Sequence, residues 1–410
     1  MTDLERQEII KIALLASCAS VLHLLESFIP YPIPGLKLGL ANIITLIAMI
    51  TMGFNAGIYV VLLRVIIGSV FAGSLFSPGF ILSFSGSLMS AFAMGFVLFV
   101  INRKKIIFSI VGISIIGALV HNFTQLFIVS TILIKNVFVI WLIPVLWAGG
   151  LVMGFVSGFL ASRVYKELEL SKRKKYNAVN KLKLFEPHNQ YKKSDSVLHR
   201  LSGGFKILVF LVIAIILFTT NNTNIMGALA ATAILLVIFS KMPISIILKN
   251  IKRISFLVLF CFMGNLFSSF GDVLYSFGFI IITNQGLSAG ILVAIRLVLF
   301  VTFASIIVYT TSVKAALRIV KKTASPLRHI GMNPEKIAVM INLCLRSIPI
   351  IYDEIHKALL GLKKKKGGKR FVYSIAIAIR NTVLIFREFE NIGNEQLVAI
   401  NEDAAMTAKA

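Results

Sequence analysis

Long apolar stretches and short polar ones alternate along the chain, and a polar segment at 163–200 divides the apolar stretches into two blocks. A helix needs about 20 apolar residues to cross the hydrocarbon core of a bilayer. On that criterion the first block predicts six membrane-spanning helices. They are expected at Ile9–Phe28, Leu38–Met52, Ala56–Phe71, Ile81–Ile101, Ile107–Ile134 and Val137–Ser162.

The second block predicts four further spans, followed by a stretch of different character. From 311 to 370 basic residues recur among apolar ones, which is typical of amphipathic helices at a membrane surface. The stretch 371–386 is short for a span and contains Arg380, so we place it on the inner surface. The tail from Asn401 is predicted to be disordered. The four spans are expected at Phe205–Phe218, Ile225–Phe239, Ile254–Phe270 and Gly286–Thr310.

Composition supports an all-α integral membrane protein. Of 410 residues, 57% are hydrophobic and only 14% are charged, and the mean hydropathy of +0.89 excludes a soluble globular domain. The net charge is +25, from 42 Lys and Arg against 17 Asp and Glu. In a membrane protein such an excess marks cytoplasmic loops rather than a nucleic-acid surface, so no nucleic-acid partner is predicted.

The positions of the basic residues predict the topology. With the N-terminus in the cytoplasm, Arg103, Lys104 and Lys105 after the fourth helix and the basic cluster from Arg163 onward both lie inside. The loops that contain IPYPIPG and SLFSPG then lie outside. Four spans in the second block return the chain to the cytoplasm, so a cytoplasmic C-terminus is also predicted.

Motifs for enzymatic chemistry are missing from the sequence. It has no GxxxxGK[ST] loop for a nucleotide, no aspartate-rich DDxxD for magnesium and diphosphate, and no HExxH or Ser-His-Asp arrangement. Cys18, Cys261 and Cys344 all lie in apolar stretches, which provides neither a disulfide framework nor a metal site. We therefore predict a protein that is not an enzyme, with no metal and no directly bound cofactor.

Polar residues inside the predicted spans of the first block are candidates for ligand binding, because such groups are costly in lipid. His121 and Gln125 lie four apart on one helix face, with Asn122 beside them. They suit a pocket for a ligand head group, or equally an interhelical hydrogen-bond cluster worth about 1 kcal/mol. For Arg64, either Glu26 or an anionic ligand is the expected partner.

Two further candidates lie where the Pro-rich loop enters the second helix. Lys37 and Asn42 are close to a helix N-terminus, which favours anions. The alternative for Lys37 is contact of its ammonium group with lipid head groups.

In the second block, NLCLRSIPIIYDEIHKALLG combines Arg346 with a helix that contains Pro349 and then with charged residues that include Glu354. We prefer a helix that docks onto a partner protein. A solvated amphipathic helix is the alternative.

The first block resembles a known family. The stretch PIPGLKLGLANIITLIAMITMGFNAGIYVVLLRVIIGSVFAGSLFSPG, followed by GALVHNFTQLF, closely resembles the family labelled heptaprenyl diphosphate synthase component I, also called the Gx transporter family. That family is similar to the substrate-binding S components of energy-coupling-factor (ECF) transporters. The resemblance covers roughly residues 8 to 165.

The second block, roughly residues 196 to 400, resembles the transmembrane T component of the same transporters (EcfT/CbiQ-like), in LHRLSGGFKILVFL and SPLRHIGMNPEKIAVMINLCLRSIPIIYDEI. In that family two Ala-Arg-Gly motifs on cytoplasmic coupling helices dock into two ATP-binding subunits, which make the S component topple and release its substrate inward. Here LLGLKKKKGGK and REFENIGNEQL stand at those positions, without Ala-Arg-Gly. We assign ATPase coupling to Arg346, Pro349, Glu354, Lys363, Lys364, Lys365, Lys366 and Arg387.

Together the resemblances imply a six-helix S-component-like bundle and a T-component-like unit of four or five spans with cytoplasmic coupling helices. The domains expected are 1–165, a basic linker at 166–198, the T-like part at 199–400 and the tail at 401–410. In the S family the first loop closes over the substrate from outside, which gives IPYPIPGLK the role of a lid. The expected substrate-binding residues are Pro34, Gly35, Lys37, Asn42, Arg64, Ser77, His121, Asn122 and Gln125.

The leading hypothesis is the membrane subunit of an ECF importer in a prokaryotic plasma membrane, which takes up a small vitamin-like or precursor molecule. The partners implied are two ATP-binding cassette subunits, which hold ATP-Mg, together with membrane lipid. One alternative is a membrane partner in polyprenyl diphosphate or quinone synthesis. Another is a scaffold uncoupled from ATPases.

Overall fold

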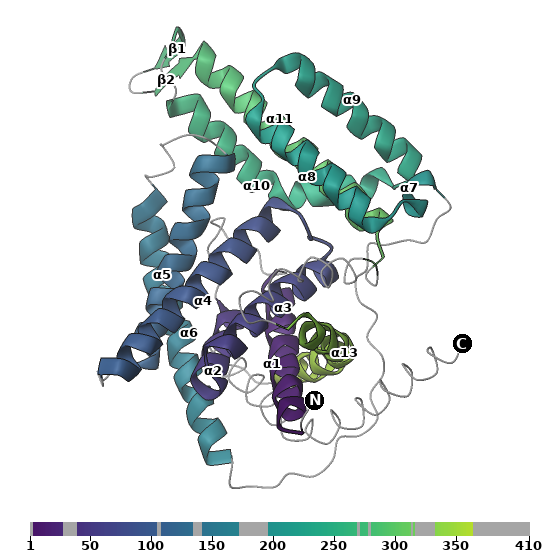
Figure 1. Ribbon diagram of the computed structural model, residues 1–410. Helices are drawn as coiled ribbons and strands as arrows, with labels where there is room; N and C mark the ends of the chain where they lie inside the picture. Colours follow the sequence, from purple (N-terminus) through teal and green to yellow (C-terminus); the bar gives the residue numbers. More distant parts are fainter. Residues whose placement is uncertain are drawn as a thin grey trace.

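The computed structural model describes residues 3–27, 39–104, 108–133, 142–171, 196–268, 271–277, 280–312, 315 and 333–363. Within these ranges the regular secondary structure is helical apart from one β-hairpin (Figure 1). Seven of the described helices are long and apolar enough to cross a membrane. The predicted class, an all-α integral membrane protein, is confirmed.

The first module consists of helices α1 to α6, at the places where the apolar pattern predicts them. α1 is largely buried, whereas α4 to α6 turn large apolar side chains such as Phe96 and Phe155 outward, 68% and 56% exposed. Such a surface is suited to lipid. The helices are α1 (Asp3–Ser27), α2 (Leu40–Met52), α3 (Phe54–Ala72), α4 (Pro78–Lys104), α5 (Ile110–Ile128), continued by the π-helical turn η1 (Val129–Leu133), and α6 (Ile143–Ser171).

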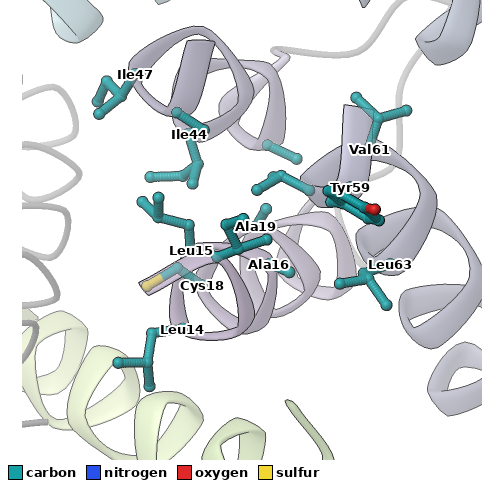
Figure 2. Packing of buried hydrophobic residues seen from close by; sticks show 14 of the residues in the cluster. Leu14, Leu15, Ala16, Cys18, Ala19, Ile44, Ile47, Tyr59, Val61 and Leu63 are labelled. Carbon is teal, nitrogen blue, oxygen red and sulfur yellow. The ribbon is translucent and has the colours of Figure 1, made fainter. Parts of the chain in front are cut away.

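Small residues on α1 allow the centre of the first module to pack closely. Ala16 and Ala19 of α1 lie between side chains of α2 and α3, among them Ile44 and Tyr59 (Figure 2). The hydroxyls of Ser17 and Ser20 donate to carbonyl oxygens one turn back in α1 at 2.7 Å, so their protons are satisfied within the helix. Small residues that let helices approach closely supply the van der Waals packing that associates helices in a membrane, where no hydrophobic driving force acts between them.

The second module begins with α7 (Val197–Arg200), α8 (Gly203–Thr219) and α9 (Thr223–Ser240), and continues with α10 (Ile244–Ser268) and α11 (Asn284–Thr310). α10 starts ten residues before the predicted span at Ile254, because Lys249, Lys252 and Arg253 are exposed on a continuing helix rather than in a loop. An antiparallel hairpin, β1 (Val273–Phe277) with β2 (Ile280–Thr283), joins α10 to α11 and was not predicted.

The last described helix, α13 (Pro334–Lys363), packs beside α1 of the first module (Figure 1). Its apolar residues, including Met340, Cys344 and Ile348, join the buried cluster of α1, α2 and α3. The Cys344 thiol donates to the Ala13 carbonyl oxygen at 3.1 Å. The amphipathic pattern of this segment is therefore explained by a partner within the chain itself.

The two modules also meet at the turn between α3 and α4. Phe76 has a left-handed backbone (φ 63°), and its ring lies 5.8 Å from that of Phe210 on α8, centroid to centroid. Arg253 of α10 donates to the carbonyl oxygen of Ala72, at the end of α3, at 3.3 Å. The basic linker expected at 166–198 is described only at its ends, where α6 continues to Ser171 and α7 begins.

Candidate functional site

A small polar cavity lies in the first module and is lined by residues of α1 to α6. Its volume is about 40 Å³, room for a few water molecules in this conformation. Four of the predicted binding residues line it: Asn42, Arg64, His121 and Asn122. The other lining residues are His23, Glu26, Gly39, Ser83, Ser87, Ser90, Met94, Ser114, Gly117, Ala118, Gly150, Met153 and Ser157.

Arg64 is the buried cation of this cavity. Its guanidinium group is 3% exposed and donates from Nη2 to Asn42 Oδ1 at 2.5 Å. Glu26, the acid of the cavity, is 2% exposed and accepts the backbone N–H of Leu40 at 2.7 Å, so it caps the N-terminus of α2. The carboxylate attracts the guanidinium group across the cavity, which offsets part of the cost of burying both.

The amides of α5 bond to neighbouring helices. Asn122 Nδ2 donates to the carbonyl oxygen of Leu146 on α6 at 2.9 Å, and Gln125 Nε2 donates to that of Leu82 on α4 at 3.3 Å. Asn122 also lines the cavity. It therefore combines the two alternatives left open by the sequence, a place in a polar pocket and an interhelical hydrogen bond. Gln125 lies one turn further along α5 and lines a different cavity.

Hydroxyl groups form much of the wall, and they were not singled out from the sequence. Ser83, Ser87 and Ser90 follow one face of α4 at spacings of four and three, a signal that sequence inspection could have used. The hydroxyls of Ser114 and Ser157 lie 2.9 Å apart between α5 and α6.

Two glycines explain how imidazole rings fit beside this wall. A Cβ atom added to Gly68 would come within 2.9 Å of the His23 ring, and one added to Gly86 within 3.0 Å of the His121 ring. Both lie at packing contacts, as glycines at membrane-helix crossings often do.

Some polar atoms of the cavity have no hydrogen-bond partner among the described residues. They are Nε of Arg64 and the Ser90 hydroxyl. Native proteins leave few buried polar atoms unpaired, and an unpaired one is a natural place for water or a ligand. A cation, amides and hydroxyls in a small cavity suit an anionic or hydrogen-bonding group.

Comparison with known proteins separates the two halves of the chain. Residues 15–164 match the family model described as heptaprenyl diphosphate synthase component I, and residues 194–358 match the one described as cobalt transport protein. The chain is also similar to ECF transporter transmembrane proteins. Its second half resembles the membrane component of such transporters. We call α7 to α13 the T-like module from here on.

Several relatives are named energy-coupling factor transporter transmembrane protein EcfT. One from Ruminiclostridium cellulolyticum is 33% identical over 168 residues, which are 41% of this chain and 63% of the relative. One from Streptococcus thermophilus is 28% identical over 43% of this chain and 67% of the relative. One from Brevibacillus brevis is 29% identical over 50% and 80%. This chain thus covers less than two thirds of the first relative's own length. The names are those of transporter membrane proteins rather than enzymes.

Several predicted residues lie elsewhere or outside the described ranges. Ser77 caps α4, where its hydroxyl accepts the N–H of Phe80 at 3.2 Å, and it does not line the cavity. In the T-like module Arg346 is exposed on α13 and Pro349 lies within that helix. Glu354 and Lys363 belong to α13 by their backbone. Pro34, Gly35, Lys37, Lys364, Lys365, Lys366 and Arg387 lie outside the described residues.

Proposed function

We propose that the chain is the membrane subunit of an ECF-type importer in a prokaryotic plasma membrane. The first module would act as the substrate-binding S component for a small vitamin-like or precursor molecule. The T-like module would connect it to two separate ATP-binding subunits that hydrolyse ATP-Mg. The observation that carries the proposal is the packing of α13 of the T-like module on α1, a wall of the polar cavity.

This contact supports mechanical coupling. α13 meets α1 at Ala13, while Glu26 at the other end of the same helix lines the cavity. Thirteen residues of helix span about 20 Å. A displacement of α13 by ATPases would therefore act on the binding site through one rigid helix.

The contact between the modules supports a toppled arrangement of the first module. The charge distribution predicts that Ala72 lies at an outer helix end and Arg253 at an inner one. The hydrogen bond between them then joins predicted opposite sides of the membrane. A first module rotated relative to the T-like module reconciles these positions, and such a rotation is what inward release by an S component requires.

The polar cavity favours ligand binding over prenyl-chain synthesis. Its lining contains a single carboxylate, that of Glu26, and this group already caps α2. A magnesium diphosphate site holds the metal with one or two carboxylates besides the phosphate oxygens, and the carboxylate of this lining is already engaged by the N–H of Leu40. Among the described residues no three His, Cys, Asp or Glu side chains are grouped to hold a metal ion.

Purification from the native membrane in mild detergent tests the proposal. Mass spectrometry of the co-purified proteins is expected to find two ATP-binding subunits per chain. Replacing Lys363, Lys364, Lys365 and Lys366 with Ala is expected to release them, since the lysines stand where a coupling motif is expected. A soluble prenyltransferase in place of the ATPases would refute the proposal. A chain that purifies without partners would favour an uncoupled scaffold, as the missing Ala-Arg-Gly motifs suggest.

A further inference from the structure

The β1–β2 hairpin carries four large apolar side chains that are exposed. Val273, Leu274 and Tyr275 of β1 are 61%, 59% and 60% exposed, and Ile281 of β2 is 48% exposed. The hairpin lies at the joined ends of α10 and α11 (Figure 1). Contiguous exposed apolar side chains mark a surface that contacts a protein or a membrane.

The apolar side chains occupy both faces of the hairpin. Across the two strands Tyr275 pairs with Ile282 on one face, and Ser276 pairs with Ile281 on the other. Each face therefore presents a large exposed apolar group, Tyr275 on one and Ile281 on the other. An antiparallel hairpin with one face in water keeps that face polar. Neither face of this hairpin is suited to water.

Charged residues are almost missing from this part of the sequence. Between Arg253 and Arg296 the one charged residue is Asp272, which precedes β1. Exposed edge strands in soluble proteins carry charged side chains, lysine above all, which prevent pairing with other chains. The strands here have none, so the surroundings of the hairpin are expected to be apolar.

The base of the hairpin is firmly attached to α11. The backbone N–H of Asp272 donates to Gln285 Oε1 at 2.8 Å, and Gln285 Nε2 donates to Asp272 Oδ2 at 2.9 Å. The N–H of Asn284 donates to the Asp272 carbonyl oxygen at 2.9 Å. The carboxylate also lies near the N-terminus of α11, where a negative charge is favourable. Whatever binds the hairpin therefore positions the end of α11 as well.

Two physical limits fix the depth of the hairpin. It joins two predicted spans, so the membrane surface is its nearest surroundings. The hydrocarbon core is excluded, because the outer edges of a two-stranded hairpin carry backbone groups that need water as a partner. The head-group region offers both water and the upper parts of the acyl chains, and it is the level at which tyrosine is enriched in membrane proteins.

We propose that the hairpin is an interfacial anchor that binds the lipid surface of the outer leaflet. The outer side follows from the predicted topology, which places Arg253 near the inner end of α10. A second copy of the chain is a poorer partner, because the strands have only five and four residues and their pairing shifts register between Val273 and Tyr275. The anchor holds the outer ends of α10 and α11 at a fixed depth, against which the first module can rotate.

Depth-dependent fluorescence quenching tests the anchor. In the full chain Trp141 and Trp147 are replaced with Phe, and Tyr275→Trp then supplies the single indole, in nanodiscs of phosphatidylcholine. Lipid bromines close to the head group are expected to quench it more strongly than bromines near the chain end, and aqueous iodide only weakly. Ile281→Trp, on the opposite face of the hairpin, should give the same result. Thermal unfolding confirms that each variant folds.

Two control variants mark the limits of depth. Asn224→Trp, exposed at the start of α9 on the same predicted side, should be quenched severalfold more strongly by iodide than Tyr275→Trp. Ile234→Trp, 62% exposed near the middle of α9, should be quenched most by bromines near the chain end.

Three results would overturn the proposal. Iodide quenching of Tyr275→Trp or Ile281→Trp equal to that of Asn224→Trp would place the hairpin in water. The bromine profile of Ile234→Trp would place it in the hydrocarbon core. Protection from both quenchers would mean that a protein, a partner or a second copy, covers it. None of these measurements needs a substrate or an ATPase, so their outcome is independent of the importer proposal.

Discussion

Replacing Met340 with Ala tests whether packing holds α13 against α1. The Met340 side chain is 1% exposed within the cluster that α13 shares with the first module. Loss of a buried Met side chain costs about 2–5 kcal/mol, because apolar contacts are removed and a cavity remains. If that cost falls on docking, the undocked population rises at least about 30-fold.

Cys344 reports the undocked population. Burial raises the pKa of its thiol from the usual 9.0 to about 12, and the thiol is 0% exposed, so it reacts with a maleimide only after α13 leaves α1. Cys18 and Cys261 are first replaced with Ala, which leaves Cys344 as the single thiol of the chain. The labelling rate of Met340→Ala is expected to exceed that of the parent at least about 30-fold.

Lys336→Ala is the matched control on the same helix. Lys336 forms an ion pair with Glu5 at 3.1 Å, but the two side chains are 30% and 42% exposed. Such a surface pair contributes about 0–1 kcal/mol, so labelling should accelerate by no more than about fivefold. Equal acceleration by the two variants would refute the argument that buried apolar contacts dominate this interface.

Three further outcomes are expected. Glu26→Gln removes the charge that caps α2 and should lower the free energy of unfolding by about 1.5–3 kcal/mol, measured by denaturation in detergent; an unchanged value would mean that the carboxylate is not needed there. Gly86→Ala should cost about 1–3 kcal/mol by crowding the histidine of α5, whereas Gly227→Ala, with no atom within 4 Å of the added Cβ, should not, and similar melting of both variants would contradict this. In a cysteine-free chain, an impermeant maleimide should label Asn224→Cys in intact cells but Arg103→Cys only after lysis, and the reverse pattern would invert the predicted topology.

The sequence predicts those parts of the fold that depend on a local run of residues, such as the length of an apolar stretch. Apolar length places each described span of the first module, because lipid demands such length of every helix. This criterion does not find the start of α10. Lys249 and Lys252 are exposed on the helix, but in the sequence they look like residues of a polar loop. The criterion does not find the hairpin either, because Ile280–Thr283 is only one more short apolar run. The docking of Cys344 on Ala13 joins residues 331 positions apart, which no local pattern contains.

The sequence predicted those site residues whose burial in lipid is energetically unfavourable, such as a charged side chain. It did not predict the serines of the cavity wall, whose hydroxyl groups can be satisfied within their own helix. Arg64 and His121 stand out in apolar helices, and both line the cavity. A serine hydroxyl can donate to its own helix, as Ser17 does, so a serine in a span carries little information by itself. Only the repeat of serines along one face of α4 separates wall residues from such self-satisfied ones.

The position of α1 links these observations. It is surrounded by α2, α3 and α13, and it carries Glu26 at one end and the contact with Cys344 toward the other. A scaffold that is uncoupled from ATPases would not require a helix of the T-like module to pack in the core of the module that holds the cavity. A transporter does require such packing, because a displacement driven by ATP hydrolysis reaches the binding site only through a rigid, well-packed interface. The buried α1–α13 interface therefore favours coupling, even though the Ala-Arg-Gly motifs are missing.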